Sequence, residues 1–192
     1  MTDSPAAKET WRIFLVAFAA TFAAMLLTEG MNLVDPFVRQ DDFPALLGNQ
    51  DQYFSKTLSE GRWLNYWWHA RPFLWPAPVN NIVFLVGWSL YASATAAMSL
   101  GTHSHPWYII ALSLMIVIGP QATSIALWFN TLIPGVWILA IFAVANLRFG
   151  LNFVRWSLLI FVPLTLLAYS TYPFLILATF LARHDQKRTV AD

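Results

Sequence analysis

At 192 residues, with 58% hydrophobic and 11% charged side chains, the chain departs from the globular average of about 45–50% apolar and roughly 25% charged residues. A formal net charge of +1 with scattered Lys and Arg residues argues against nucleic acid as a partner, and the absence of cysteine excludes disulfides, thiolate metal sites and cysteine nucleophiles. The composition therefore predicts an all-α membrane protein with a single domain over residues 1–192. One crossing needs about 20 apolar residues, so the length allows five or six.

The first predicted crossing covers residues 11–33. The amino terminus before it is polar, and the apolar run continues for too long and lacks a small-residue cleavage site, so we expect a retained helix rather than a signal peptide. Lys8 and Arg12 place the amino terminus in the cytoplasm by the positive-inside rule. The segment 34–78 then lies on the outer face of the membrane.

The segment 34–78 is the longest polar interval of the chain, and prolines interrupt it near both ends. Its aromatic and leucine side chains recur at spacings near three, four and seven, which predicts short amphipathic helices on the bilayer surface. These side chains are Tyr53, Phe54, Leu58, Trp63, Leu64, Trp67 and Trp68.

Two further apolar runs follow. Residues 79–100 form the second predicted crossing, and the small side chains between 92 and 97 allow another helix to approach closely. Residues 107–147 carry no charge, but Gly119-Pro120 interrupts them, and Asn130 with Pro134-Gly135 interrupts them again, which predicts a broken or re-entrant helix.

The last apolar run covers residues 156–182, after a short predicted loop that carries Arg148 and Arg155. The stretch 169–173 makes this run either one kinked helix or two short ones. We expect five crossings, because 27 residues divide poorly into two full spans. Six is the alternative, since it returns the basic polar tail 183–192 to the cytoplasm.

Three carboxylates in the segment 34–78 are candidate site residues. The adjacent pair Asp41 and Asp42 has three possible roles, which are to hold a divalent cation, to act as a general base, or to solvate a turn. A base needs a raised pKa, which a neighbouring like charge provides, so the pair forms the candidate catalytic group. Asp51 is a candidate substrate-binding residue. No metal site is predicted, and the sequence neither requires nor excludes a divalent cation.

Two arginines in the same segment lie among aromatic residues. Arg62 and Arg71 have the geometry to hold a phosphate through paired N–H groups, while Trp63 and Trp67 contact a sugar ring or a lipid chain. The alternative is that both arginines are interfacial anchors that reach the phosphates of membrane lipids. The residues alone leave both interpretations open.

The order of these parts resembles the bacterial O-antigen glucosyltransferase II family, whose members are polytopic enzymes of the GT-C architecture. One crossing is followed by an outer loop with Asp41-Asp42, then by Ser59-Glu60-Gly61-Arg62-Trp63-Leu64, then by short apolar helices. The family starts with an Asp-Asp pair and a Gly-Arg-aromatic element. The stretch 169–174 is similar to a tyrosine-containing turn between its later helices.

This resemblance implies transfer of a sugar from a polyprenyl-phosphate donor to a periplasmic glycan or lipid-linked acceptor at the bacterial inner membrane. It implies that Asp41 or Asp42 deprotonates the acceptor hydroxyl. It also implies that Arg62 and Arg71 neutralise the donor phosphate as it leaves, since negative charge develops there.

The resemblance covers most of this chain but only the front part of such an enzyme. The sequence therefore predicts a truncated enzyme or one half of a split enzyme that needs a second membrane subunit. The alternative is a non-catalytic accessory subunit of a larger membrane complex, so the sequence leaves open whether the chain is an enzyme. A transporter component is less favoured, because the predicted spans carry no acid or base apart from Arg12 and Glu29 near the two ends of the first one.

Overall fold

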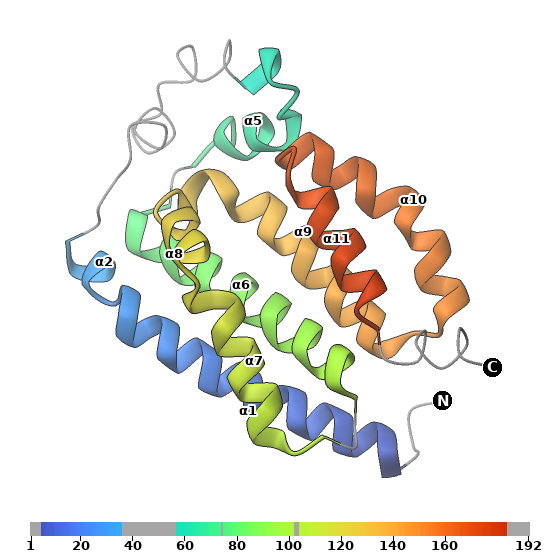
Figure 1. Ribbon diagram of the computed structural model, residues 1–192. Coiled ribbons are helices and arrows are strands. Elements are labelled where there is room, and N and C mark those ends of the chain that lie inside the picture. The colour runs from blue at the N-terminus through green and yellow to red at the C-terminus, as the bar shows by residue number, and fades with distance from the viewer. Residues whose placement is uncertain (1–4, 36–56, 74, 102–103, 184–192) are drawn as a thin grey trace.

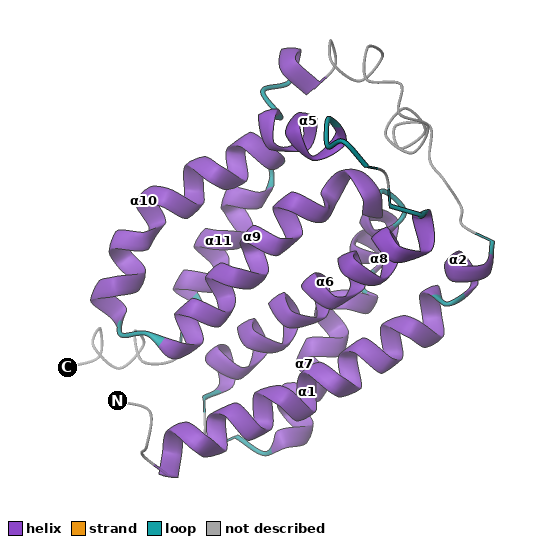
Figure 2. Cartoon of the chain, turned by 180° about the vertical axis from the view of Figure 1, so that it is seen from behind, coloured by secondary structure: helices purple, strands orange, loops and turns teal. Residues whose placement is uncertain are grey.

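The structure is a computed structural model that describes residues 5–35, 57–73, 75–101 and 104–183. Every regular element within these ranges is an α-helix (Figures 1 and 2). In chain order the helices are α1 (Pro5–Glu29), α2 (Met31–Val34), α5 (Trp63–His69), α6 (Ala77–Leu100), α7 (Pro106–Ile118), α8 (Pro120–Ala126), α9 (Phe129–Arg148), α10 (Leu151–Ala168) and α11 (Tyr172–Leu181).

Four of the described helices are long and apolar enough to cross a membrane. They lie in α1, α6, α9 and α10, with mean hydropathies between 1.5 and 1.8. Helices α7 and α11 are also apolar but contain only 13 and 10 residues. The prediction of an all-α chain with several helices able to span a membrane is confirmed.

Helices α6 and α9 form the centre of the bundle. In the apolar stretches that could span a membrane, 67% of the residues are buried in α6 and 61% in α9, compared with 28% in α1 and 22% in α10. Helices α1 and α7 pack on α6, and α10 and α11 pack on α9 (Figure 1). The outer faces of α1 and α10 therefore expose large apolar side chains, as expected of faces that meet lipid.

Small residues allow α6 to lie close to its neighbours. A Cβ added to Gly87 would meet the Cγ1 atom of Val136 at 2.9 Å, so this glycine permits the contact between α6 and α9. The predicted small-residue face is confirmed, because its members are all buried and Ser93 approaches Thr21 of α1 at 3.5 Å between hydroxyl oxygens. Those members are Ala92, Ser93, Ala94, Ala96 and Ala97.

The first crossing ends earlier than its apolar composition predicts. Helix α1 stops at Glu29, and a turn at Gly30 separates it from the short α2. The Asn32 side-chain amide donates to the Glu29 carboxylate at 2.7 Å. A polar contact is thus formed where the chain leaves the long helix.

The predicted break at Gly119-Pro120 is confirmed, because α7 ends at Ile118 and α8 begins at Pro120. The predicted second break at Pro134-Gly135 is wrong. Helix α9 begins at Phe129 and continues through Pro134. A proline removes one backbone hydrogen bond, and buried packing on both sides of this helix maintains it despite that loss.

The last apolar run consists of two helices. Helix α10 already begins at Leu151, so the prediction that Arg155 lies in a loop is wrong. It ends at Ala168, and Pro173 then occupies the first turn of α11, where the missing N–H of a proline costs nothing. Because α11 returns beside α10, the two termini lie at the same end of the bundle (Figure 1).

Candidate functional site

The predicted site residues fall into two groups. The three carboxylates, Asp41, Asp42 and Asp51, lie outside the described residues. The two arginines and the two exposed tryptophans lie in residues 57–73, which cover the end of the bundle opposite the termini (Figure 1). We call residues 57–73 the end cap.

A left-handed glycine shapes the start of the end cap. Gly61 has a φ of 72°, a conformation that side chains disfavour, and nothing lies within 4 Å of an added Cβ. Its N–H donates to the Leu58 carbonyl at 3.1 Å, and the Arg62 N–H donates to the Thr57 carbonyl at 2.7 Å. The glycine of the Gly-Arg-aromatic element is therefore needed for the backbone turn before α5, and not for space.

Helix α5 exposes tryptophans and buries polar side chains. Trp63 and Trp67 are 45% and 61% exposed, whereas Asn65 and His69 are 1% and 3% exposed. The exposed aromatic face agrees with the predicted amphipathic surface helix. The buried polar face was not predicted. The spacing does indicate it, because Asn65 and His69 are four residues apart and each follows an exposed tryptophan by two residues, which places them on the opposite face of the helix.

Asn65 connects the end cap to α10. Its side-chain amide donates to the carbonyl of Ala168 at 2.9 Å, and Ala168 is the last residue of α10. The last carbonyls of a helix have no partner within the helix, so this bond satisfies one of them. The Oδ1 atom of Asn65 is buried and has no hydrogen-bond partner among the described residues.

Arg62 connects the end cap to the turn between α10 and α11. Its Nε lies 3.0 Å from the Glu60 carboxylate, and its Cζ lies 4.5 Å from the centre of the Tyr169 ring. The rings of Tyr169 and Tyr172 are 5.4 Å apart. The arginine of the Gly-Arg-aromatic element thus contacts the tyrosine-containing turn, through a cation–π interaction.

Arg71 lies over the ring of Trp68 and beside Trp75, at the other end of α5. Its Cζ lies 4.1 Å from the Trp68 ring and 5.6 Å from the Trp75 ring, and Nη1 donates to the Trp68 carbonyl at 2.7 Å. Its Nε is buried and has no hydrogen-bond partner among the described residues. Burial lowers the pKa of Arg71, which remains a cation because guanidinium groups stay protonated in proteins.

The buried His69 is neutral. Burial, and then the positive charge of Arg71, lower the pKa of His69 from 6.5 to about 3. At neutral pH the imidazole therefore has one donor and one acceptor nitrogen and carries no charge.

The two arginines do not converge on one point. Arg62 and Arg71 flank the seven residues of α5, which span about 10 Å along the helix axis. The structure thus brings Arg71 together with Trp68, and Arg62 together with Glu60 and Tyr169. The exposed Trp63 and Trp67 lie between the two arginines in the sequence, on the outward face of α5.

Two fully buried asparagines join α6 and α9 near the end cap. The Asn80 amide donates to the Asn130 side-chain carbonyl at 2.6 Å and approaches the Trp75 carbonyl at 3.4 Å. Within the described residues, the Oδ1 of Asn80 and the Nδ2 of Asn130 have no hydrogen-bond partner. Buried polar atoms are usually satisfied, so this pair is a second polar centre beneath the aromatic residues that hold Arg71.

The described part of the site therefore offers a stacked guanidinium with an unpartnered Nε, a neutral buried imidazole and two exposed indoles. Over the same residues, no group of three or more His, Asp or Glu side chains gathers as metal ligands do. No protein-family model, curated protein or solved structure matches the chain.

Proposed function

We propose that this protein is a GT-C-type membrane glycosyltransferase that transfers a sugar from a polyprenyl-phosphate donor to a periplasmic glycan or lipid-linked acceptor. The observation that carries the proposal is Arg71, whose guanidinium lies over the Trp68 ring and beside Trp75, with a buried Nε that has no partner among the described residues. The reaction class, sugar transfer, comes from the resemblance of Asp41-Asp42 and of the Gly-Arg-aromatic element to motifs of the O-antigen glucosyltransferase II family.

Arg71 has the chemistry to bind the donor phosphate. One of its terminal nitrogens, Nη1, already donates to a carbonyl, which fixes the orientation of the guanidinium plane. The Nε edge is then the part that can donate to a phosphate oxygen. Because the cation is partly buried, its attraction to a phosphate that gains charge in the transition state is stronger than in bulk water.

In this proposal Arg62 is a positioning residue. It pairs with Glu60 and contacts Tyr169, and so holds α5 against the turn between α10 and α11. Trp63 and Trp67 contact the lipid chain or the sugar of the donor. Asp41 or Asp42 acts as the base for the acceptor hydroxyl, as the resemblance implies, and Asp51 contributes to substrate binding.

The distribution of cations supports a cytoplasmic location for both termini. The end of the bundle that holds the termini carries five basic residues among those described, and Lys and Arg accumulate on the cytoplasmic side of membrane proteins. The end cap then faces the periplasm. We propose six passes, of which α7 and α11 are short, in place of the five expected from the sequence, because the last apolar run forms two helices. The five residues are Lys8 and Arg12 near the start of α1, Arg148 at the end of α9, Arg155 near the start of α10, and Arg183 just after α11.

A transfer assay tests the proposal. Membranes from a host that lacks the gene and is complemented with the full chain are given a radiolabelled polyprenyl-phosphate sugar, and label in the glycan is counted. Removing a group that stabilises transition-state charge costs about 10²–10³-fold in rate, so we expect Arg71→Gln to lose that much. Arg155→Gln, an exposed arginine of α10, is the matched control and keeps full transfer.

Two results would overturn the proposal. One is no transfer by the wild-type chain from any polyprenyl-phosphate donor. The other is equal transfer by Arg71→Gln and Arg155→Gln. Asp42→Asn provides an independent variant, and we expect it to lose transfer while the membrane level of the protein is unchanged.

The second candidate function is a non-catalytic accessory subunit of a larger membrane complex. The observation that favours it is that Arg62 and Asn65 direct their polar groups to protein partners, Tyr169 and Ala168, as residues of a structural cap do. This function predicts co-purification with a larger membrane partner in mild detergent. A monodisperse monomer under those conditions would count against it.

A further inference from the structure

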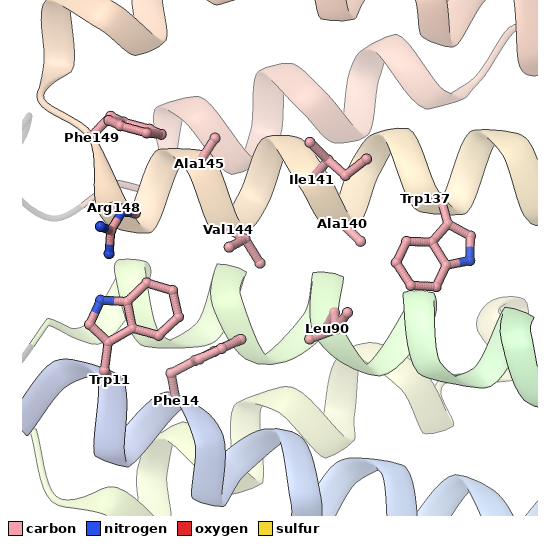
Figure 3. A pocket seen from close by; sticks show the side chains of 10 residues that line it. All are labelled: Trp11, Phe14, Leu90, Trp137, Ala140, Ile141, Val144, Ala145, Arg148 and Phe149. Carbon is pink, nitrogen blue, oxygen red and sulfur yellow. The ribbon is translucent and has the colours of Figure 1, made fainter.

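An apolar groove lies between α1, α6 and α9 (Figure 3) and runs from the middle of α9 to its last residue, away from the end cap. Its volume is about 470 Å³, within the range of about 300–1,000 Å³ that is common for ligand sites. Trp11 and Phe14 of α1 form one wall, Leu90 of α6 lies on the floor, and α9 forms the other wall from Trp137 to Arg148. Arg148 supplies the only charged side chain among the described residues that line it.

The length of the groove matches half of a bilayer. Trp137 and Arg148 are eleven residues apart on α9, which corresponds to about 16 Å along the helix axis. The hydrocarbon core of a bilayer is about 30 Å thick, so one leaflet contributes about 15 Å. Trp137 is fixed at the deep end, because its Nε1 donates to the carbonyl of Val83 at 3.2 Å.

Arg148 lies at the shallow end of the groove with its charge unpaired by any described residue. Its Cζ is 6.0 Å from the centre of the Trp11 ring, and the side chain is exposed. Its neighbours at this end are already engaged. Arg12 pairs with Glu9 at 2.7 Å, and Arg183 donates to the Phe149 carbonyl at 3.0 Å.

We propose that this groove binds an anionic glycerophospholipid of the leaflet on the side of the two termini. One acyl chain lies along the apolar walls between α1 and α9, and the lipid phosphate pairs with Arg148. A cation at headgroup depth, above an apolar groove one leaflet long, fits the charge and the shape of such a lipid. This site is separate from the donor site proposed at the end cap.

Lipid binding by the purified full chain tests the proposal. Native mass spectrometry in detergent compares phosphatidylglycerol with phosphatidylcholine of the same acyl chains. We expect tighter binding of phosphatidylglycerol, about fivefold weaker binding of it by Arg148→Gln, and unchanged binding by Arg155→Gln. Arg148→Lys keeps the charge and retains the preference for phosphatidylglycerol.

A second variant tests the groove itself. Ala145 is a partly exposed lining residue, so Ala145→Phe fills the groove from its rim, and we expect it to weaken the binding of both lipids. Equal binding of the two lipids by the wild-type chain, or equal losses in Arg148→Gln and Arg155→Gln, would overturn the proposal. Tighter binding of undecaprenyl phosphate than of phosphatidylglycerol would overturn a bilayer phospholipid as the occupant.

Discussion

Gly135 of α9 lies directly against the ring of Tyr172, the first residue of α11. A Cβ added to Gly135 would overlap ring atoms of Tyr172 and would approach the Cβ of Ala168 at 3.2 Å. Tyr172 is fully buried, at 1% exposure. This close contact seats the turn between α10 and α11 on α9, and the same turn carries the Tyr169 ring that contacts Arg62.

We expect Gly135→Ala to destabilise the protein, because the added methyl group enters a space that the Tyr172 ring fills. Overpacking of this kind costs about 1–3 kcal/mol. Thermal unfolding in detergent, followed by circular dichroism, measures the loss. Gly150→Ala is the control, since nothing lies within 4 Å of its added Cβ, and it should change stability by less than about 0.5 kcal/mol. Equal stabilities of the two variants would contradict the contact.

The Asn80–Asn130 pair predicts energetic coupling between α6 and α9. Asn80→Ala leaves the buried side-chain carbonyl of Asn130 without its donor, so we expect the free energy of unfolding to fall by about 1–3 kcal/mol. A double-mutant cycle with Asn130→Ala should give a coupling of at least about 0.6 kcal/mol, the average for polar pairs between membrane helices, whose maximum is about 1.7 kcal/mol. The control is Ser99→Ala, because Ser99 donates only within α6, to the Thr95 carbonyl at 2.8 Å. Additive losses would show that the two amides do not interact.

His69 predicts that the end cap loosens in acid. Its pKa is about 3 in the folded protein and 6.5 when unfolded, so between these values the unfolded state binds the proton and the folded state does not. Stability is therefore full above pH 6.5 and falls as the pH drops, by about 2 kcal/mol from pH 7 to pH 5 at about 1.4 kcal/mol per unit. Hydrogen exchange over residues 63–69 measures this opening.

His69→Gln removes the titrating group. In this variant we expect the hydrogen exchange of residues 63–69, corrected for the intrinsic effect of pH, to be independent of pH between 5 and 7. The exposed His105 offers the matched variant, since His105→Gln leaves the end cap intact and should retain the wild-type dependence. A His69→Gln protein that still loosens in acid would show that another group is responsible.

The left-handed turn at Gly61 predicts that replacing this glycine destabilises residues 57–62 alone. Gly61→Ala forces a side chain into a φ of 72°, which costs about 1–2 kcal/mol. We expect faster hydrogen exchange at residues 57–62 and no change in α6 and α9. Asparagine tolerates this conformation better than alanine, so Gly61→Asn should recover part of the loss. The same exchange rate for alanine and asparagine would argue against backbone strain as the cause.

The sequence predicts those features of the fold that depend on composition and short-range spacing. The apolar composition indicates a membrane bundle, the small residues of α6 indicate close helix packing, and Gly119-Pro120 marks a helix end. The predicted helix break at Pro134 is wrong, because the buried packing around α9 keeps the helix continuous despite the proline. The predicted loop that carries Arg155 is also wrong. Helix α10 already begins at Leu151, and Arg155 is tolerated because it lies at an exposed position one turn into this helix.

The site was less predictable than the fold, because its contacts join distant parts of the chain. The spacing of Trp63 and Trp67 indicated an exposed face, but it did not reveal that Arg62 lies over Tyr169, more than a hundred residues later. No local pattern identifies such a partner. Asn65 likewise bonds to Ala168 only because α10 ends there.

The shortness of α7 and α11 has a consequence for the surrounding bilayer. Helices of 13 and 10 residues extend about 20 Å and 15 Å, well short of a hydrocarbon core of about 30 Å. Lipids beside them must compress to avoid exposing acyl chains to water, at a fraction of a kcal/mol per Å. We therefore expect the protein to thin the membrane locally, and its unfolding temperature should be higher in bilayers of short-chain lipids than in bilayers of long-chain lipids.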